Sequence, residues 1–290
     1  MKKTVEYLNE IIDFQFNGNI SIGLKHLDLI TNSLFKLTQS LYDYKEQPNY
    51  HLRELEGKYF RFGLANHSII KLIEGNQFEL IDKSVLIPDI FSFKSLTRMQ
   101  IESYLIMHYL FYDNVSDEEK VLRYDIYKIH ALNKQLSFKI NFETPNVLEQ
   151  RKKIESELQL AIDNMKASSF YMSANEKERK SFLRPRYPKL VDSKELFKSS
   201  GLEKSGLDNM WQLYSNYAHS EYISDRQYNT TYNIKKSFSE DSSMIILINL
   251  ILTSKLTEKI ASIFRSAKET FETLTEKERT IINTWSDVNK

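Results

Sequence analysis

Apolar residues recur at helical spacing along most of the chain. Residues 3–16 and 20–44 each place apolar side chains three or four positions apart, with a break at Gly18 between them. Positions at that interval fall on one side of an α-helix, and this side can pack against a core. The pattern therefore predicts two amphipathic helices here and a third over residues 50–74, which ends at Gly75.

Residues 89–112 have a different pattern. Their apolar side chains spread around nearly the whole circumference of a helix instead of forming one stripe. This predicts a buried helix at the centre of the fold. Arg98 and Glu102 nevertheless lie one turn apart on one side of it, and two charged groups in a core need partners.

The segments around this central helix are also predicted from local rules. Residues 78–88 are expected to be extended or irregular, because the residue before Pro88 avoids the helical conformation. Ser116, followed three residues later by Glu119, has the capping-box pattern of a helix start. Further helices are expected over residues 117–135, 206–219 and 241–265.

Residues 145–180 are the most charged part of the chain. Lys and Glu are dense there, whereas apolar residues are sparse between Leu148 and Met165, which is typical of an exposed helical arm. We expect an all-α fold with one domain over residues 1–290. It would be a multi-helix bundle around the central helix, with the charged arm and a basic loop over residues 145–190.

Composition supports this fold class. The 290 residues include only 7 Gly and 5 Pro, which favours long helices over many short strands with tight turns. The 40 Lys and Arg nearly balance the 39 Asp and Glu, so any binding to nucleic acid must come from a local patch. The absence of cysteine excludes disulfides, thiolate catalysis and Cys-ligated metals.

The sequence predicts a soluble cytoplasmic protein without a membrane partner. The N-terminus becomes polar before an apolar segment of signal-peptide length has formed. The most hydrophobic run, residues 244–252, is about half as long as the roughly 20 residues of a membrane-spanning helix.

Two separated motifs resemble a known group of proteins. The helix with Arg98 and Glu102 is followed, about a hundred residues later, by Tyr214-Ser-Asn-Tyr217-Ala-His219-Ser and then by a hydrophobic helix. Together these features resemble a bacterial family of all-helical proteins of unknown function. That family is in turn distantly similar to abortive-infection and HEPN-like proteins. The resemblance implies a phage-defence or toxin-like effector that acts on RNA.

The Arg-x4–6-His motif of HEPN ribonucleases occurs twice, as Arg61 with His67 and as Arg123 with His130. With 11 Arg and 6 His in the chain, about one such match is expected by chance. Neither pair has the usual polar residue after the Arg. We therefore assign HEPN catalysis to neither pair.

Arg98, Glu102 and His219 are the candidate catalytic residues. A histidine can transfer a proton near neutral pH, a carboxylate can orient it, and an arginine can hold a phosphate. This trio would suffice for metal-independent RNA cleavage. In the alternative reading, Arg98 and Glu102 form a structural ion pair, and His219 is hydrogen-bonded to one of them or favoured at its helix C-terminus.

No motif predicts a cofactor or a metal. The six histidines show no HxH, HxxxH or HExxH spacing, and no P-loop or GxGxxG motif is present.

The candidate nucleic-acid-binding residues lie in the loop of residues 184–189. Arg184, Arg186 and Lys189 could contact phosphates, and Tyr187 could stack on a base. The alternative is a solvated linker.

Two hypotheses remain open. In the first, the protein is an RNA-directed effector with Arg98, Glu102 and His219 at the reaction centre. In the second, it is a non-catalytic helical scaffold that binds a partner protein, or a second copy of itself, through residues 145–180.

Overall fold

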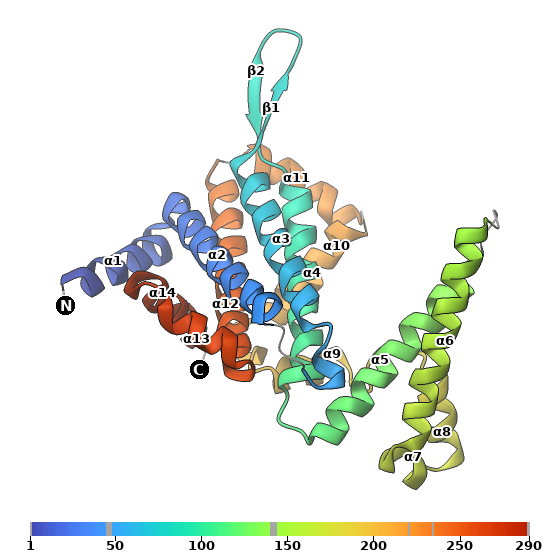
Figure 1. Ribbon diagram of the computed structural model, residues 1–290. Coiled ribbons are helices and arrows are strands. Elements are labelled where there is room, and N and C mark those ends of the chain that lie inside the picture. Colours follow the sequence, from blue (N-terminus) through green and yellow to red (C-terminus); the bar gives the residue numbers. More distant parts are fainter. Residues whose placement is uncertain (1, 45–47, 140–143, 220, 234, 289–290) are drawn as a thin grey trace. The chain divides into compact units, whose positions relative to one another are not determined.

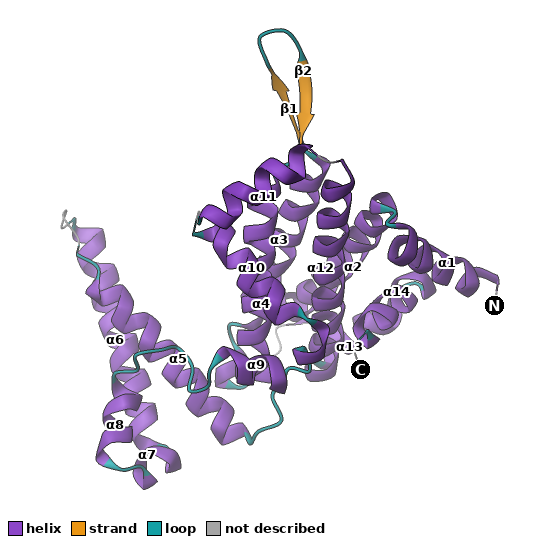
Figure 2. Ribbon diagram, turned by 180° about the vertical axis from the view of Figure 1, so that it is seen from behind, coloured by secondary structure: helices purple, strands orange, loops and turns teal. Residues whose placement is uncertain are grey.

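The all-α prediction is confirmed. The computed structural model describes residues 2–44, 48–139, 144–219, 221–233 and 235–288 (Figure 1). These residues form fourteen α-helices, short helical turns and one two-stranded sheet (Figure 2). The chain divides into two compact units, so the single domain expected over residues 1–290 stays a prediction. Unit 1 comprises Met1–Gln47, Glu54–Ile106 and Gly201–Lys290, and unit 2 comprises Pro48–Arg53 and Met107–Ser200.

Unit 1 is built around two long helices, α2 and α12. Helix α12 packs against α2, α3, α11, α13 and α14, and α2 also packs against α1, α3, α13 and α14. The elements of unit 1 are α1 (Lys2–Asn17), α2 (Ile20–Tyr44), α3 (Leu55–Glu74), β1 (Asn76–Glu79), β2 (Ser84–Ile87), α4 (Ile90–Met107), η3 (Glu203–Ser205), α10 (Leu207–Ala218), α11 (Tyr222–Asn233), α12 (Lys235–Ile263), α13 (Arg265–Thr273) and α14 (Glu276–Asp287).

The hydrophobic run of residues 244–252 lies in α12. Ile245, Ile246, Leu250 and Leu252 are all fully buried. Such a run covers more than one side of a helix, and in α12 it is covered by helices on several sides. No described helix is long and apolar enough to cross a membrane.

A chain of buried amides links the core helices of unit 1. Asn66 of α3 donates to Thr31 of α2 (3.1 Å) and to Thr253 of α12 (2.8 Å). It accepts from Gln100 of α4, which also donates to the carbonyl of Phe62. Buried polar groups need such partners, so this network favours one register of the four helices.

Helix α4 and the turn after it cover most of the predicted central helix. One side of α4 is buried, as at Phe93, Ile101 and Tyr104, whereas Met99 and Glu102 are exposed. After α4 the chain continues as one π-helical turn, η2 (His108–Tyr112).

The extended segment predicted before α4 is an antiparallel hairpin of β1 and β2. It projects beyond the ends of α3 and α4 (Figure 1). Gly75 precedes β1 with a φ of +89°, and a Cβ at this position would lie 3.1 Å from the backbone carbon of Ile87. Glycine therefore permits the sharp exit from α3.

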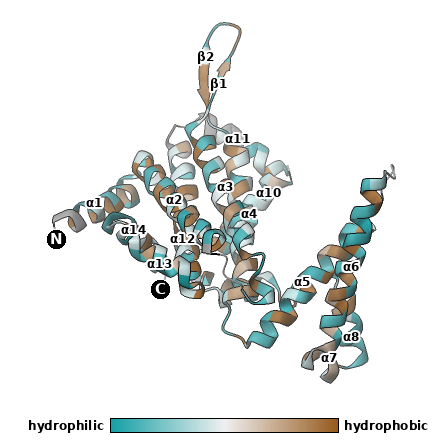
Figure 3. Cartoon of the chain, viewed as in Figure 1, coloured by the Kyte–Doolittle hydropathy of each residue, from teal (hydrophilic) through white to brown (hydrophobic). Residues whose placement is uncertain are grey.

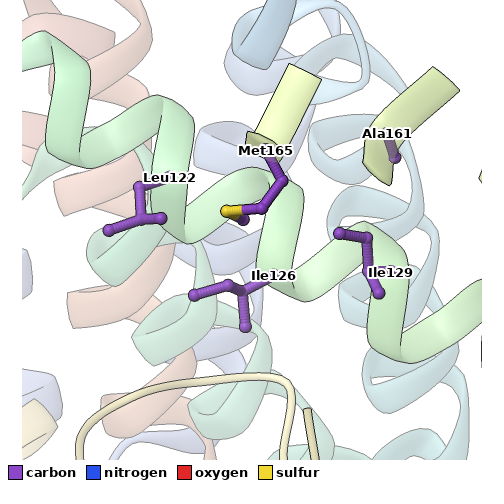
Figure 4. Packing of buried hydrophobic residues seen from close by; sticks show 5 residues of the cluster. All are labelled: Leu122, Ile126, Ile129, Ala161 and Met165. Atoms are coloured by element: carbon purple, nitrogen blue, oxygen red, sulfur yellow. The ribbon is translucent and has the colours of Figure 1, made fainter. Parts of the chain in front are cut away.

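Unit 2 has a smaller core between α5 and α6. Leu122, Ile126 and Ile129 of α5 pack with Ala161 and Met165 of α6 (Figure 4). The elements of unit 2 are η1 (Tyr50–Leu52), η2, α5 (Asp117–Ser137), α6 (Pro145–Ala167), α7 (Ser169–Ser173), α8 (Glu176–Leu183) and α9 (Ser193–Ser199). At the start of α5, Ser116 accepts a hydrogen bond from the Glu119 N–H, as the capping pattern predicts.

The predicted charged arm corresponds to α6, α7 and α8. Its apolar residues are few, but Ala161 and Met165 fall on the side that meets α5. Elsewhere on α6 the charges pair one turn apart, as in Glu149 with Lys153 (2.8 Å). Exposed pairs of this kind add only a few tenths of a kcal/mol, about 0.3–0.5 each, so the core contact holds α6 in place.

Candidate functional site

Arg98 joins α4 to α10. Its Nε donates to the Ser215 hydroxyl (3.0 Å), and its Nη1 lies 2.9 Å from a Glu102 carboxylate oxygen. The guanidinium also stands 5.6 Å from the centre of the Trp211 ring. Arg98 therefore has one partner on its own helix and two on a helix from a distant part of the sequence.

The Arg98–Glu102 pair lies at the surface. The Arg98 side chain is 24% exposed and that of Glu102 is 50% exposed. Water screens an exposed pair, so the pair itself contributes at most about 1 kcal/mol. The exposure also leaves both charged groups accessible to a ligand.

His219 lies at the C-terminal end of α10, as predicted, and is exposed. Its backbone N–H donates to the carbonyl of Ser215 (3.1 Å). Among the residues that the structure describes, its imidazole makes no hydrogen bond or ion pair. The imidazole that was expected to meet Arg98 is thus replaced there by the Ser215 hydroxyl.

The two helices run antiparallel where they touch. Lys94 of α4 contacts Tyr217 of α10, whereas Arg98, one turn later in α4, contacts Ser215. Advancing along α4 therefore corresponds to moving backwards along α10.

Because α4 and α10 are antiparallel, two of the three predicted catalytic residues, Glu102 and His219, lie apart. Glu102 follows Arg98 by one turn in one direction, and His219 follows Ser215 by one turn in the opposite direction. Each turn is about 5.4 Å long, so the two residues diverge by roughly 11 Å along the helices. The structure brings Arg98 together with Glu102, but it does not pair either of them with His219.

A buried lysine on α4 was missed by the sequence reasoning. The Lys94 side chain is only 3% exposed, and its Nζ lies 2.7 Å from Asp241 of α12. It also donates to the Tyr217 hydroxyl (3.0 Å), and that hydroxyl contacts Gln227 of α11. The cluster ties α4, α10, α11 and α12 together.

Lys94 could have been suspected from its position one turn before Arg98, beside Phe91. Burial raises the pKa of the Tyr217 hydroxyl, and the hydrogen bond and charge of Lys94 partly oppose this effect. The hydroxyl is therefore neutral near pH 7. A buried lysine with a carboxylate partner stabilises the helix arrangement and offers little access to a substrate.

Arg123 of the Arg-x6-His match has its charge and hydrogen-bond partners within unit 2. Its guanidinium contacts Asp113 (2.6 Å), Glu119 (2.6 Å) and the Tyr109 carbonyl (3.0 Å). Burial alone would lower the pKa of Arg123, but the two carboxylates raise it. Burial raises the pKa of the Asp113 carboxyl, but the hydrogen bond and the charge of Arg123 lower it, and the net effect is a lowered pKa. Arg123 thus has a structural role at the start of α5.

His130 lies two turns after Arg123 and is partly buried. Burial lowers the pKa of its imidazole, as does the charge of Lys134, while a hydrogen bond with the Arg186 backbone partly opposes them. Directly after the basic loop, the Leu190 N–H donates to the Tyr109 hydroxyl (3.0 Å), which attaches this end of the loop to η2.

The side chains of the basic loop remain accessible. Arg184, Arg186 and Tyr187 are exposed, and the Arg186 guanidinium lies 5.2 Å from the centre of the Tyr187 ring. Neither arginine side chain forms a hydrogen bond or ion pair within the described residues. Lys189 donates to the Ser193 hydroxyl (3.0 Å) and is less available.

The other Arg-x-His match lies at the surface of α3. Arg61 and His67, the other Arg-x-His match, are exposed on α3, and Arg61 donates to the Gly57 carbonyl of its own helix. In the part of the chain that the structure describes, no three His, Asp or Glu side chains are grouped so that they could hold a metal ion.

Comparison with known proteins does not add to these geometric observations. None of the protein-family models, curated proteins or solved structures that were compared with the chain matches it. The resemblance to abortive-infection and HEPN-like proteins therefore stays a prediction.

Proposed function

We propose that this protein binds single-stranded RNA through the basic loop of unit 2. The observation that carries the proposal is the pair of exposed arginines, Arg184 and Arg186, whose guanidinium groups form no hydrogen bond or ion pair with the described residues. Guanidinium groups bind phosphate oxygens in a planar, two-pronged geometry. The exposed ring of Tyr187 directly follows Arg186 in sequence and can stack on a base.

The charge of unit 2 supports the same proposal. Its residues include 18 Lys and Arg against 14 Asp and Glu, whereas the rest of the chain has an excess of acidic residues. A polyanion is therefore attracted to unit 2 rather than to the whole chain.

The attachment of the loop also matters for binding. Tyr109 holds the backbone at Leu190, directly after the loop, which lowers the entropy cost of ordering the loop when a ligand binds. This favours phosphate contacts at fixed positions over a solvated linker.

Fluorescence anisotropy with a labelled 12-nucleotide single-stranded RNA tests the proposal. The double substitution Arg184→Ala/Arg186→Ala should weaken binding at least tenfold and make the dependence on log[salt] less steep by about 1.4, or 0.7 for each lost phosphate contact. Tyr187→Ala should weaken binding roughly 5- to 150-fold, whereas Tyr187→Phe, which keeps the ring, should change it little.

A matched control keeps this test specific. Lys152→Ala/Lys166→Ala removes two exposed positive charges from α6 of the same unit and should leave most of the affinity intact. An equal loss in the control, or no RNA binding by the unaltered protein at low salt, would refute the proposed site.

A second candidate function is metal-independent RNA cleavage by Arg98, Glu102 and His219. The observation that favours it is their exposure, since a substrate could reach the carboxylate and the imidazole on either side of Arg98. The 2′-hydroxyl would attack the adjacent phosphate, with His219 accepting its proton and Arg98 holding the phosphate. The bond from phosphorus to the 5′-oxygen would break, leaving a 2′,3′-cyclic phosphate, and the departing 5′-oxygen would take a proton from water. A toxin or phage-defence role would follow from such cleavage.

Cleavage of labelled RNA in the presence of EDTA tests this candidate. His219→Ala should abolish cleavage without lowering the midpoint of thermal unfolding. It should also abolish the growth arrest that expression of the protein causes in bacteria. If Arg98→Ala lowers stability and no variant or parent protein cleaves RNA, the trio has the structural role of a non-catalytic scaffold.

A further inference from the structure

The hairpin of β1 and β2 has one apolar face. Residues opposite each other in an antiparallel pair point to the same side, and successive residues alternate between sides. Phe78 lies opposite Val85, and Asn76 lies opposite Ile87. Leu80, two residues after Phe78, continues this side. We call Phe78, Leu80, Val85 and Ile87 the apolar face.

The other side of the hairpin is mostly polar. There the Ser84 hydroxyl donates to the Glu79 carboxylate (2.8 Å) and accepts from the Gln77 amide. Leu86 is the one apolar residue on this side of the two strands, and it is 61% exposed. The polar side therefore suits water, and the apolar face does not.

Phe78 and Leu80 of the apolar face are exposed in the described chain, whereas Val85 and Ile87 are partly buried. Phe78 is 46% exposed, Leu80 is 48% exposed, and Ile81 at the tip is completely exposed. Figure 3 shows hydrophobic residues along both strands. A two-stranded hairpin is marginally stable in water unless its apolar side packs on another element.

The hairpin is firmly attached at its base. The Gly75 N–H donates to the Lys71 carbonyl (3.1 Å), and the Asp89 N–H donates to the Leu72 carbonyl (3.1 Å). Asp89 also caps α4 through the Ser92 N–H (3.0 Å). The apolar face is thus presented in a defined orientation.

We propose that the apolar face is a dimer interface, on which the same face of a second copy of this chain packs across a two-fold axis. An isologous interface requires a surface that is complementary to itself, and two apolar ribbons of equal width meet this requirement. When the two hairpins pack face to face, each covers the apolar side of the other, which a single hairpin leaves in contact with water.

The available area fits a weak dimer. A large side chain has roughly 150–250 Å² of surface, so the exposed fractions of Phe78 and Leu80 on the apolar face, together with Ile81 at the adjoining tip, amount to about 350 Å² per copy. With the exposed parts of Val85, Ile87 and the strand backbone, the pair would bury at most about 1,000 Å². This is the lower end of specific interfaces, where association is concentration-dependent.

The charges near the tip favour a protein surface over a lipid surface. Glu79 and Asp82 flank Ile81, with only Lys83 to balance them. Carboxylates next to the inserted residue oppose entry into an anionic membrane.

Sedimentation velocity of the full-length protein over roughly 1–300 µM tests the interface, because weak association that is detectable in this range is expected of a small interface. Leu80→Asp should make the protein monomeric throughout. Leu86→Asp places the same charge on an even more exposed leucine of the polar side and should leave the dimer intact. Phe16→Asp, on an exposed apolar residue of α1, controls for any other apolar contact and should have no effect.

Cross-linking gives an independent readout, since the natural chain has no cysteine. Val85→Cys at the middle of the apolar face should form an intermolecular disulfide on mild oxidation, whereas its neighbour Ser84→Cys should not. The proposal is overturned by a monomer at all concentrations, by a dimer that survives Leu80→Asp, or by a dimer that only Phe16→Asp disrupts. Binding of the hairpin to anionic vesicles without self-association would also overturn it.

Discussion

Asp125 should make the stability of unit 2 depend on pH between about 4 and 7. This aspartate of α5 is 2% exposed. Burial raises the pKa of its carboxyl from the usual 3.8 to about 6, although a hydrogen bond with Tyr50 and the charge of Lys128 oppose the rise. The folded protein thus holds a proton that the unfolded chain releases.

The magnitude follows from the two pKa values. Each pH unit of difference corresponds to 1.36 kcal/mol, so the charged carboxylate lowers the free energy of unfolding by about 2–3 kcal/mol once the pH exceeds both values. The sign is that of a raised pKa: the stability is fully present below pH 3.8 and is lost as the pH rises through about 6. The variant Asp125→Asn cannot titrate and should lack this loss.

Urea unfolding followed by circular dichroism, repeated between pH 4.5 and 7.5, measures the effect. The stability of Asp125→Asn relative to the parent should increase by about 1–2 kcal/mol over this interval, since part of the loss has already occurred at pH 4.5. The change with pH is the diagnostic, because the new amide also adds buried donors that cost about 1–2 kcal/mol at every pH.

Asp163→Asn is the matched control. Asp163 is exposed on α6, so its removal changes the charge of the same unit without relieving burial. A constant difference between Asp125→Asn and the parent across the pH range, or one that falls as the pH rises, would refute the reasoning.

Three further predictions concern unit 1. Lys94→Ala should lower the free energy of unfolding by about 3 kcal/mol because it leaves Asp241 without its lysine partner, whereas Arg98→Ala should lower it by less than about 1–2 kcal/mol. Urea denaturation of both variants measures the difference. Asn66→Ala should cost about 2 kcal/mol in the same assay, since Gln100 and two threonines lose their shared partner. Gly75→Ala should cost about 1–3 kcal/mol, and faster amide hydrogen exchange over residues 76–87 should show that the loss is concentrated in the hairpin.

The local features of the fold could be predicted from the sequence. The bounds of α2 match the predicted helix over 20–44, and the Ser116 cap lies where its motif indicated. Such features depend on residues three or four positions apart. The basic loop also follows from local composition, because two prolines interrupt a cluster of cations.

The candidate site could not be predicted in the same way. Which side of α4 is covered, and in which direction α10 crosses it, depends on contacts between residues more than a hundred positions apart. The sequence therefore identified Arg98 but paired it with His219 rather than Ser215. It also overlooked Lys94, because lysine is seldom buried unless the tertiary structure provides a partner.

The pairing of α2 with α12 has a consequence for synthesis on the ribosome. About 200 residues separate the end of α2 from the start of α12. At roughly 5–20 residues per second, α2 emerges about 10–40 s before the helix that covers its apolar side. Unit 2 is translated during that interval, and its α5–α6 contact is local enough to form first. The nascent chain would thus expose, for many seconds, the apolar side of α2 that α12 later covers, and in that interval it is prone to aggregation.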